Sequence, residues 1–325
     1  TEILNGVRHK SILLVTALCS ILLCSCGSGL EDAYQLTAAS DISITEDNED
    51  GFKAAGFASA LCVPEGDMAL DPEGVNAAAF GLFNVTDREV VSQLGIYDKV
   101  YPASTTKVLT CLIALERGDL DDIVTVPEES DITVSGSSMA DLLPGDQLTL
   151  RDLLYGLMVP SGNDAAVAIA CHISGSVSDF CELMNQRAAE IGATGSHFVN
   201  PHGLPDDDHY TTAYDMYLIL NEAMKHPDFP QFASQSEYTA SVTGTDGAVR
   251  QVTWENGNGF LAGNFQLPDG VQMKAGKTGH TNAAGFCLVL SETTGSGDEL
   301  ISVVFNAPTY EDLYNGMRTL ITKGL

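Results

Sequence analysis

The most constraining feature of this sequence is a short polar segment, residues 101–107, that leads directly into an apolar helix. The segment reads Tyr-Pro-Ala-Ser-Thr-Thr-Lys, and apolar residues recur at helical spacing from Val108 to Leu115. Pro102 cannot continue a helix but can stand just before one. The spacing predicts a buried helix. Ser104 and Lys107 are three positions apart, so they share one face of its first turn.

A hydroxyl beside an amine on one helix face is the arrangement of a nucleophile with its base. The helix N-terminus adds free backbone N–H groups and a positive dipole end, which stabilise developing negative charge. The same spacing also arises by chance, as a helix cap followed by a solvated lysine, about once in a chain of this length. The remaining motifs must therefore decide between the two interpretations.

Composition excludes several classes of partner. The 325 residues, 44% of them hydrophobic, suffice for one large domain or two. With 44 acidic and 15 basic residues the formal charge is −29, which argues against nucleic acid as a partner and against electrostatic docking on an anionic membrane.

Beyond residue 26 the cysteines are odd in number and lack the paired spacing of metal ligands, so we expect no obligatory disulfide framework, although one bridge is left open.

The first 25 residues have the pattern of an export signal. A basic stretch at residues 8–10 precedes an uncharged apolar run, residues 11–23, which is too short to span a membrane as a helix. The run ends in Leu-Cys-Ser-Cys-Gly, which resembles the lipobox of bacterial lipoproteins, with Cys26 as the lipidated residue and Cys24 as the weaker candidate. An ordinary secretory signal is the alternative. Residues 26–54 are acidic and polar and are expected to form a disordered tether, so the folded domain is expected at 55–325.

The later sequence alternates between strand and helix patterns. A turn at Ser161-Gly162-Asn163 is expected between two helices, because the first helix breaks at Val159-Pro160. Strands at both ends with helices between them predict one sheet built from distant segments and covered by helices. The expected strands are a hairpin at 75–94 and segments 123–127, 238–242, 249–254, 271–278, 285–291 and 300–306, and the expected further helices are 149–158, 165–173, 178–191, 213–225 and 311–322.

Three short motifs stand in order along the chain: Ser104-x-x-Lys107, Ser161-Gly162-Asn163 and Lys277-Thr278-Gly279. This trio, with Asp as the middle residue of its second motif, is known from penicillin-binding proteins and class A β-lactamases. The flanking sequences extend the match over about residues 57 to 325. With these flanking sequences the chain resembles the D-alanyl-D-alanine carboxypeptidase family. The matching segments are residues 154–166, Asn-Pro-His-Gly-Leu at 200–204, residues 209–213 and residues 277–286.

The resemblance implies a fold and an activity. The fold is mixed α/β, of the serine β-lactamase and penicillin-binding-protein type, with an antiparallel sheet flanked by helices plus an all-helical subdomain. The activity is removal of the terminal D-Ala from peptidoglycan stem pentapeptides through an acyl-serine intermediate, without cofactor or metal. β-Lactam antibiotics are then expected to acylate the site. The protein is expected at the outer face of the cytoplasmic membrane, anchored by a lipid on Cys26, or secreted if it is not lipidated.

The resemblance also implies roles for residues. Ser104 is the expected nucleophile and Lys107 its base, if burial and the second cation Lys277 lower the pKa of Lys107. Ser161 and Lys277 are expected to relay a proton to the leaving amine, and the backbone N–H groups of Ser104 and His280 to form the oxyanion hole. The residues expected to contact the substrate are Asn163, Lys277, Thr278, Gly279 and His280.

The sequence departs from the family where relatives commonly carry an arginine that helps to hold the substrate carboxylate. Gly257 occupies that place, and Lys274 is a hypothetical substitute, in which case Lys274→Ala should raise KM.

Four other interpretations compete with the peptidase. A metal site at His202, His209 and the Asp run 206–208 lacks the spacing of a ligand cage. A class A β-lactamase needs a Glu-x-x-Leu-Asn loop, which residues 182–185 do not match. A D,D-endopeptidase of the same family and a catalytically inactive wall-binding lipoprotein remain alternatives.

Overall fold

The computed structural model describes residues 57–64, 66 and 68–325, and Ala58–Leu325 form one unit. The expected signal segment, Cys26, the acidic tether and the boundary near residue 54 lie outside the described residues. Within the described residues, no helix is both long enough and apolar enough to cross a bilayer.

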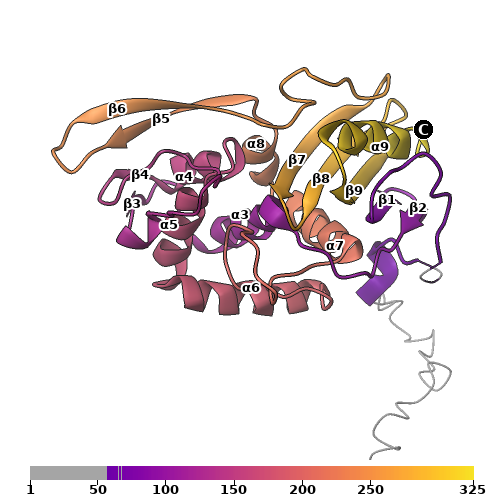
Figure 1. The fold of residues 1–325 in the computed structure, drawn as a ribbon, viewed down its shortest axis with the longest axis horizontal. Coiled ribbons are helices and arrows are strands. Elements are labelled where there is room, and N and C mark those ends of the chain that lie inside the picture. Colours follow the sequence, from indigo (N-terminus) through magenta and orange to yellow (C-terminus); the bar gives the residue numbers. More distant parts are fainter. Residues whose placement is uncertain (1–56, 65, 67) are drawn as a thin grey trace, which may run out of the picture. The chain divides into compact units, whose positions relative to one another are not determined.

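The main element is a five-stranded antiparallel sheet in the order β2-β1-β9-β8-β7 (Figure 1). Its N-terminal hairpin joins the sheet through β1, which pairs with β9 from Ala79↔Phe305 to Asn84↔Leu300. Strands from the two ends of the unit are thus neighbours, which confirms the prediction of one sheet built from distant segments. The strands are β1 (Ala79–Asn84), β2 (Glu89–Leu94), β7 (Gln272–Thr281), β8 (Gly285–Thr293) and β9 (Glu299–Ala307).

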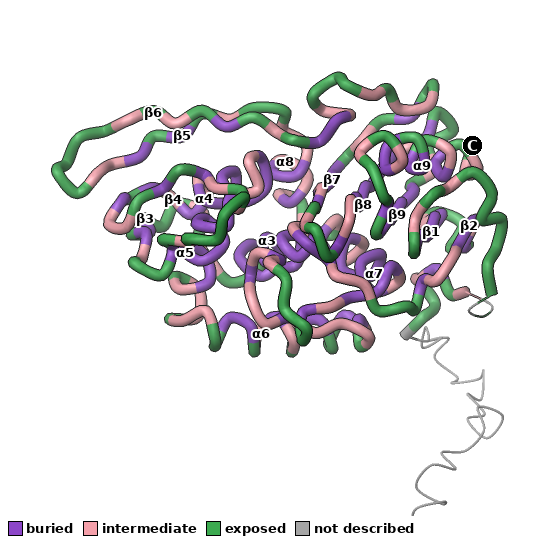
Figure 2. Tube along the Cα trace, in the orientation of Figure 1, coloured by how far each residue is buried: buried purple, intermediate pink, exposed green. Residues whose placement is uncertain are grey.

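Helices cover both faces of this sheet because its central strands are apolar on both sides. In β9, Val303 and Phe305 contribute to the larger core, whereas Leu300 and Val304 contribute to a second core. The larger core contains α3 (Lys107–Arg117) and α7 (Ala213–Met224), and the second contains α9 (Tyr310–Thr322). Figure 2 shows the buried positions concentrated on the central strands and on the helix sides that face them.

A second group of helices continues the larger core away from the sheet (Figure 1). It consists of α4 (Leu150–Met158), α5 (Asn163–Ser174), α6 (Val177–Ile191) and α8 (Phe229–Ala233). Local sequence explains where several helices begin: Thr149, Ser176, Thr212 and Thr309 each accept a hydrogen bond from the backbone N–H three residues later. Gly175 and Gly192, in the left-handed conformation, end α5 and α6.

A second, four-stranded sheet accompanies these helices, in the order β3-β4-β5-β6. Its strands are β3 (Ile123–Thr125), β4 (Gln147–Thr149), β5 (Glu237–Thr243) and β6 (Val249–Glu255), and the β5–β6 hairpin extends along the top of the view in Figure 1. The sequence predicted this hairpin and the β3 strand but not a separate sheet. The reason is that β4 has only three residues and joins β5 through the single pair Gln147↔Thr243.

Other predicted elements agree with the structure to within a few residues. The elements that the sequence did not predict are short: β4, α8 and the 3₁₀ turns η1 (Phe57–Ala60), η2 (Ala103–Thr106) and η3 (Glu128–Ser130). Among the described residues the five cysteines are free.

Candidate active site

The segment that carries Ser104 is a 3₁₀ turn, η2, which runs directly into the buried helix α3. Ser104 Oγ lies 3.0 Å from Lys107 Nζ, so the two side chains share one face as predicted. Lys107 is fully buried, with 0% of its surface exposed. The amine therefore reaches Ser104 from inside the protein and not from solvent.

Lys107 Nζ is surrounded by oxygen atoms from three separate segments. Besides Ser104 Oγ, it lies 2.6 Å from Asn163 Oδ1 at the start of α5 and 2.9 Å from the backbone carbonyl of His202. Burial holds the pKa of Lys107 well below its usual range, and the charge of Lys277 lowers it further, whereas Asp164 acts in the opposite direction. The setting favours a neutral amine.

Asp164 does not neutralise Lys107 because its carboxylate is occupied elsewhere. It accepts hydrogen bonds from the backbone N–H groups of Ala140, Leu142 and Ala165, at 2.8–3.0 Å. These bonds tie the loop before β4 to the start of α5. Because Asn163 N also donates to Ser138 O at 2.8 Å, the same loop forms a wall of the site.

Ser161 and Lys277 are the two further motif residues with polar side chains near Ser104 and Lys107. Ser161 lies in the break between α4 and α5 with φ +64°, and its Oγ is buried without a hydrogen-bond partner among the described residues. Lys277, on β7, is 3% exposed and donates to the carbonyl of Thr278 at 3.0 Å. Burial lowers the pKa of Lys277 to about 7. The site therefore holds an unpaired hydroxyl and an amine that titrates near neutrality.

Two glycines allow backbone to approach Ser104 closely. A Cβ on Gly279 would lie 2.9 Å from Ser104 N, and a Cβ on Gly203 would lie 1.8 Å from the Ala103 carbonyl oxygen. Ala103 itself has φ +46°, a left-handed conformation that costs a residue with a Cβ about 1–2 kcal/mol. Contacts from β7 and from the 198–210 loop hold this strained turn in place.

Two cavities meet at Ser104. The larger, about 510 Å³, is lined by Asn163, by residues 134–138 and 202–205 and by the end of β7. The smaller, about 260 Å³, is lined by Ser161, Thr278 and Gly279 and by an aromatic wall of Phe286, Tyr310 and Tyr314. Neither lining contains an Asp, Glu, Lys or Arg side chain.

The structure thus brings the residues of the three motifs together around Ser104. Gly257 lines the smaller cavity, and a Cβ there would meet nothing within 4 Å. Lys274 is exposed on β7 and lines neither cavity, so the hypothesis that it replaces the missing arginine gains no support. Cys26 lies outside the described residues.

Sequence reasoning missed several contributors. The His202 carbonyl is a backbone atom, so no residue type signals its role. The three tyrosine and phenylalanine side chains of the aromatic wall resemble ordinary core residues of a strand and an amphipathic helix. Asp164 carried a usable signal, because it is an acidic residue directly after a turn and before an apolar run.

His202 and His209 do not form a metal site. Burial, together with the charge of Lys107, lowers the pKa of His202 to about 3, and burial lowers the pKa of His209 to about 4. His209 Nε2 lies 2.9 Å from Thr106 Oγ1, and His209 Nδ1 accepts from Val199 N. Among the described residues no cluster of three His, Cys, Asp or Glu side chains is placed to hold a metal ion.

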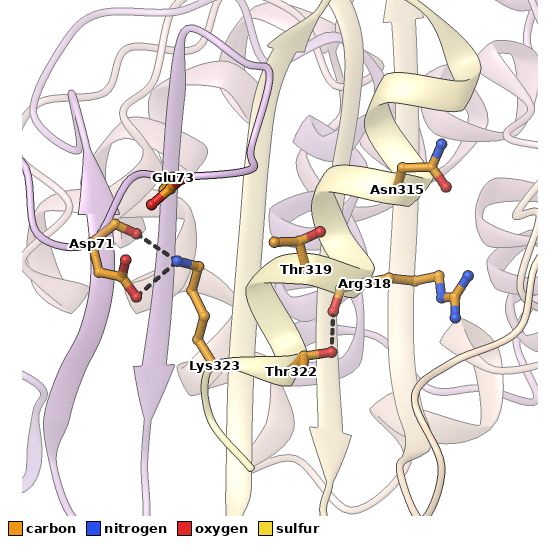
Figure 3. Close-up of a pocket in the computed structure, with 7 residues that line it drawn as sticks. All are labelled: Asp71, Glu73, Asn315, Arg318, Thr319, Thr322 and Lys323. Carbon is orange, nitrogen blue, oxygen red and sulfur yellow. Dashed lines mark hydrogen bonds and ion pairs between the residues drawn. The ribbon is translucent and has the colours of Figure 1, made fainter.

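A further hollow, of about 570 Å³, lies beside the last turns of α9 and contains none of the expected site residues (Figure 3). Lys323 Nζ contacts the side chain of Asp71 at 2.7 Å and its carbonyl at 2.9 Å, whereas the guanidinium of Arg318 points away from this pair (Figure 3). The hollow is therefore closed on one side by an internal ion pair.

Comparison with known proteins gives a consistent result. The sequence profile of one family, described as D-alanyl-D-alanine carboxypeptidase, matches residues 68–309. The chain is 34% identical to D-alanyl-D-alanine carboxypeptidase DacA of Haemophilus influenzae over 264 residues, 78% of this chain and 63% of that protein. It is 34% identical to DacF of Bacillus subtilis over 65% of this chain and 52% of that protein. The chain therefore spans about half to two thirds of the length of these relatives.

Solved structures share the fold. The Streptomyces K15 DD-transpeptidase superposes with a TM-score of 0.71 at 29% identity, covering 77% of this chain and 97% of that one. The D-alanyl-D-alanine carboxypeptidase DacD from Francisella tularensis gives a TM-score of 0.68 at 26% identity, covering 80% and 73% of the two chains. The described unit thus has the mixed α/β fold of these enzymes.

Proposed function

Because this chain belongs to the D-alanyl-D-alanine carboxypeptidase family, we propose that it removes the terminal D-Ala from peptidoglycan stem pentapeptides through an acyl-serine intermediate. One observation carries the proposal: a fully buried lysine amine with a lowered pKa lies 3.0 Å from the Ser104 hydroxyl, which opens into two cavities. Such an amine is a base for the hydroxyl proton.

The contacts of Lys107 suit the acylation step. A neutral amine has two N–H bonds, which Asn163 Oδ1 and the His202 carbonyl accept, and one lone pair, which is left for the Ser104 proton. As Ser104 Oγ bonds to the carbonyl carbon of the penultimate D-Ala, its proton passes to Lys107. The backbone N–H groups of Ser104 and His280 stabilise the oxyanion, with β7 held close by Gly279.

The smaller cavity suits the leaving group. When the C–N bond breaks, the amine of the terminal D-Ala takes a proton from the Ser161 hydroxyl, which has no competing partner among the described residues. Lys277, with its pKa near 7, restores that proton. Thr278, which lines this cavity, would hold the D-Ala carboxylate. Water then attacks the acyl ester and its proton replaces the one that Lys277 gave up, while Lys107 returns its proton to Ser104 as the tetrapeptide leaves.

Release of D-Ala from a synthetic pentapeptide tests this function. We expect chromatography to show D-Ala release by the parent chain and none by Ser104→Ala, because the other groups act on that hydroxyl. Ser241→Ala, a change on the exposed face of β5, is the matched control and should retain the parent rate. A parent chain that releases no D-Ala, or a Ser104→Ala variant that releases it normally, contradicts the proposal.

Transfer of the acyl group to an amine is a second candidate. It is favoured by the similarity to the Streptomyces K15 protein, whose structure is described as a DD-transpeptidase. Addition of a D-amino acid acceptor to the same assay distinguishes the two activities. A transpeptidase yields an exchanged peptide in proportion to acceptor concentration, whereas a carboxypeptidase yields tetrapeptide alone.

We further propose that β-lactams acylate Ser104.

We also propose that, after export, a lipid on Cys26 attaches the chain to the outer face of the membrane. The lipobox-like pattern before Cys26 supports the anchor. Labelling with radioactive palmitate in a bacterial host should be lost in Cys26→Ser and kept in Cys24→Ser. The reverse pattern would move the anchor to Cys24, and no labelling of the parent would reject it.

A further inference from the structure

We propose that His209 and Thr106 form a hydrogen-bonded relay that fixes the Ser104 turn, which makes His209 a positioning residue for the nucleophile. The inference rests on the proposed function, because it assigns a task to residues that do not touch the substrate cavities. Both side chains are buried, with His209 1% and Thr106 0% exposed. Neither residue has a part in the acyl-transfer steps described above.

The direction of the relay follows from its two ends. The backbone N–H of Val199 only donates, so His209 Nδ1 is the acceptor of their 3.1 Å hydrogen bond. A neutral imidazole with an unprotonated Nδ1 carries its proton on Nε2. That proton points to Thr106 Oγ1, 2.9 Å away. The Thr106 hydroxyl then uses its own proton for the Ala103 carbonyl, at 2.8 Å.

The end of the relay is the strained residue before the nucleophile. Ala103 has φ +46°, and Gly203 backs its carbonyl so closely that a Cβ would clash. The Thr106 hydroxyl holds this carbonyl in place. If the hydroxyl is lost, the Ala103–Ser104 peptide is free to relax toward an ordinary conformation. Ser104 Oγ would then move away from Lys107 Nζ, now 3.0 Å distant.

The same histidine also orders the other side of Lys107. Val199 belongs to the loop that presents the His202 carbonyl to Lys107 Nζ at 2.9 Å. A single imidazole thus joins the nucleophile turn to the loop that holds the base. A protonated His209 would place a second N–H against Val199 N, so the relay requires the neutral ring.

The test compares rates of acylation by a fluorescent penicillin in the full chain. We expect Thr106→Val and His209→Phe each to lower the acylation rate constant about tenfold or more, because displacements of an ångström or less carry such effects. Thr106→Ser, which keeps the hydroxyl, should stay within about threefold of the parent. The double variant should be no slower than the slower single variant, because the two residues act as one unit.

The control is Thr149→Val, which removes the hydroxyl of another N-cap threonine, the one that precedes α4, far along the chain from the Ser104 turn. It should keep the parent acylation rate. The relay is rejected if Thr106→Val acylates at the parent rate, if Thr106→Ser is as slow as Thr106→Val, or if the two losses multiply in the double variant. If His209→Phe does not fold, the Thr106 pair decides alone.

A second readout does not depend on activity. Nitrogen-15 resonances of His209 should show Nε2 protonated and Nδ1 unprotonated, with faster exchange of the Nε2 proton in Thr106→Val. A proton on Nδ1 would overturn the relay. A parent chain that is neither acylated nor active on pentapeptide would instead contradict the proposed function, while the tautomer would still decide the relay.

Discussion

Lys107 occupies a position in which an ammonium group is poorly stabilised. It is fully buried, and Asp164, whose charge would favour the ammonium form, is bound by backbone N–H groups instead. An unpaired buried charge is costly, so a buried amine lowers its pKa and becomes neutral. Lys277, only 3% exposed, adds a like charge that acts in the same direction. The two lysines are therefore coupled.

This coupling predicts a shift in pH dependence. Lys277→Met removes a like charge, so the pKa of Lys107 should rise, and the ascending limb of the acylation rate should move to higher pH. The measurement is the rate of acylation by fluorescent penicillin from pH 5 to 10. Lys274→Met, three positions earlier on the same strand but exposed, should leave the limb in place. A limb that is unmoved, or moved to lower pH, in Lys277→Met would exclude the coupling.

Glu292 is a buried carboxyl group of a different kind. It lies on β8 with 0% exposure, and neither of its oxygens has a hydrogen-bond partner among the described residues. Burial raises its pKa from the ordinary 4.5 to about 8, and the adjacent Ser302 lowers it only in part, without the geometry of a full hydrogen bond. Between these values the folded state binds the proton more tightly than the unfolded state. Glu292 therefore lowers stability progressively as pH rises from about 4.5 to about 8.

The parent and Glu292→Gln should differ in how their unfolding free energy depends on pH, because the glutamine cannot ionise. From pH 5 to 8.5 the parent should lose about 2–5 kcal/mol more unfolding free energy than Glu292→Gln. Urea unfolding at several pH values measures this difference. Glu299→Gln, an exposed glutamate on the adjacent β9, should follow the parent. Parallel curves for the parent and Glu292→Gln would mean that the carboxyl group is ionised without cost.

At the scale of elements, the close contact between the 198–210 loop and η2 decides the geometry of the site. We expect Gly203→Ala to lower penicillin acylation about a hundredfold, because its Cβ would overlap the Ala103 carbonyl and displace Ser104. Gly247→Ala is a matched control: Gly247 also has positive φ, at +78°, but a Cβ there meets nothing within 4 Å. It should acylate at the parent rate. Equal rates in all three proteins would show that the turn tolerates the displacement.

The sequence predicted helices and strands correctly where the spacing of apolar residues agreed with capping or turn residues. It failed where two strands pair through very few residues. The hairpin at 79–94, the buried helix after Ser104 and the three C-terminal strands follow from their apolar spacing. The second sheet was missed because one of its contacts is a single residue pair. The η2 turn was missed because a 3₁₀ turn before a helix has the same spacing of Ser104 and Lys107 as a helical turn.

For the whole molecule, the sheet order explains how distant motifs meet. Strand β7 carries Lys277 to the edge of the sheet, where η2 and the α4–α5 break lie against it. The sequence predicted this convergence through the order of its motifs and their resemblance to a family, not through any calculation of distance. It could not predict the His202 carbonyl or the relay through Thr106, because backbone acceptors and buried hydroxyls leave no pattern in a single sequence.

The C-terminal helix α9 packs against the sheet that contains the N-terminal hairpin, which predicts cooperative unfolding. Leu320→Ala on α9, at a fully buried position, should lower the unfolding free energy by about 2–5 kcal/mol within a single transition. Acylation well below the melting temperature should be unchanged. Leu325→Ala, at a residue 60% exposed, should have little effect. A separate early transition in Leu320→Ala would show that α9 unfolds independently.

Mass spectrometry of the chain after incubation with penicillin tests the central claim most directly, because it reports which atom is the nucleophile. We predict one added penicillin mass per chain, located by proteolysis on the peptide that contains Ser104, slow to hydrolyse and missing from both Ser104→Ala and Lys107→Met. An adduct on another residue, or undiminished labelling of Lys107→Met, would contradict a nucleophile activated by that buried amine.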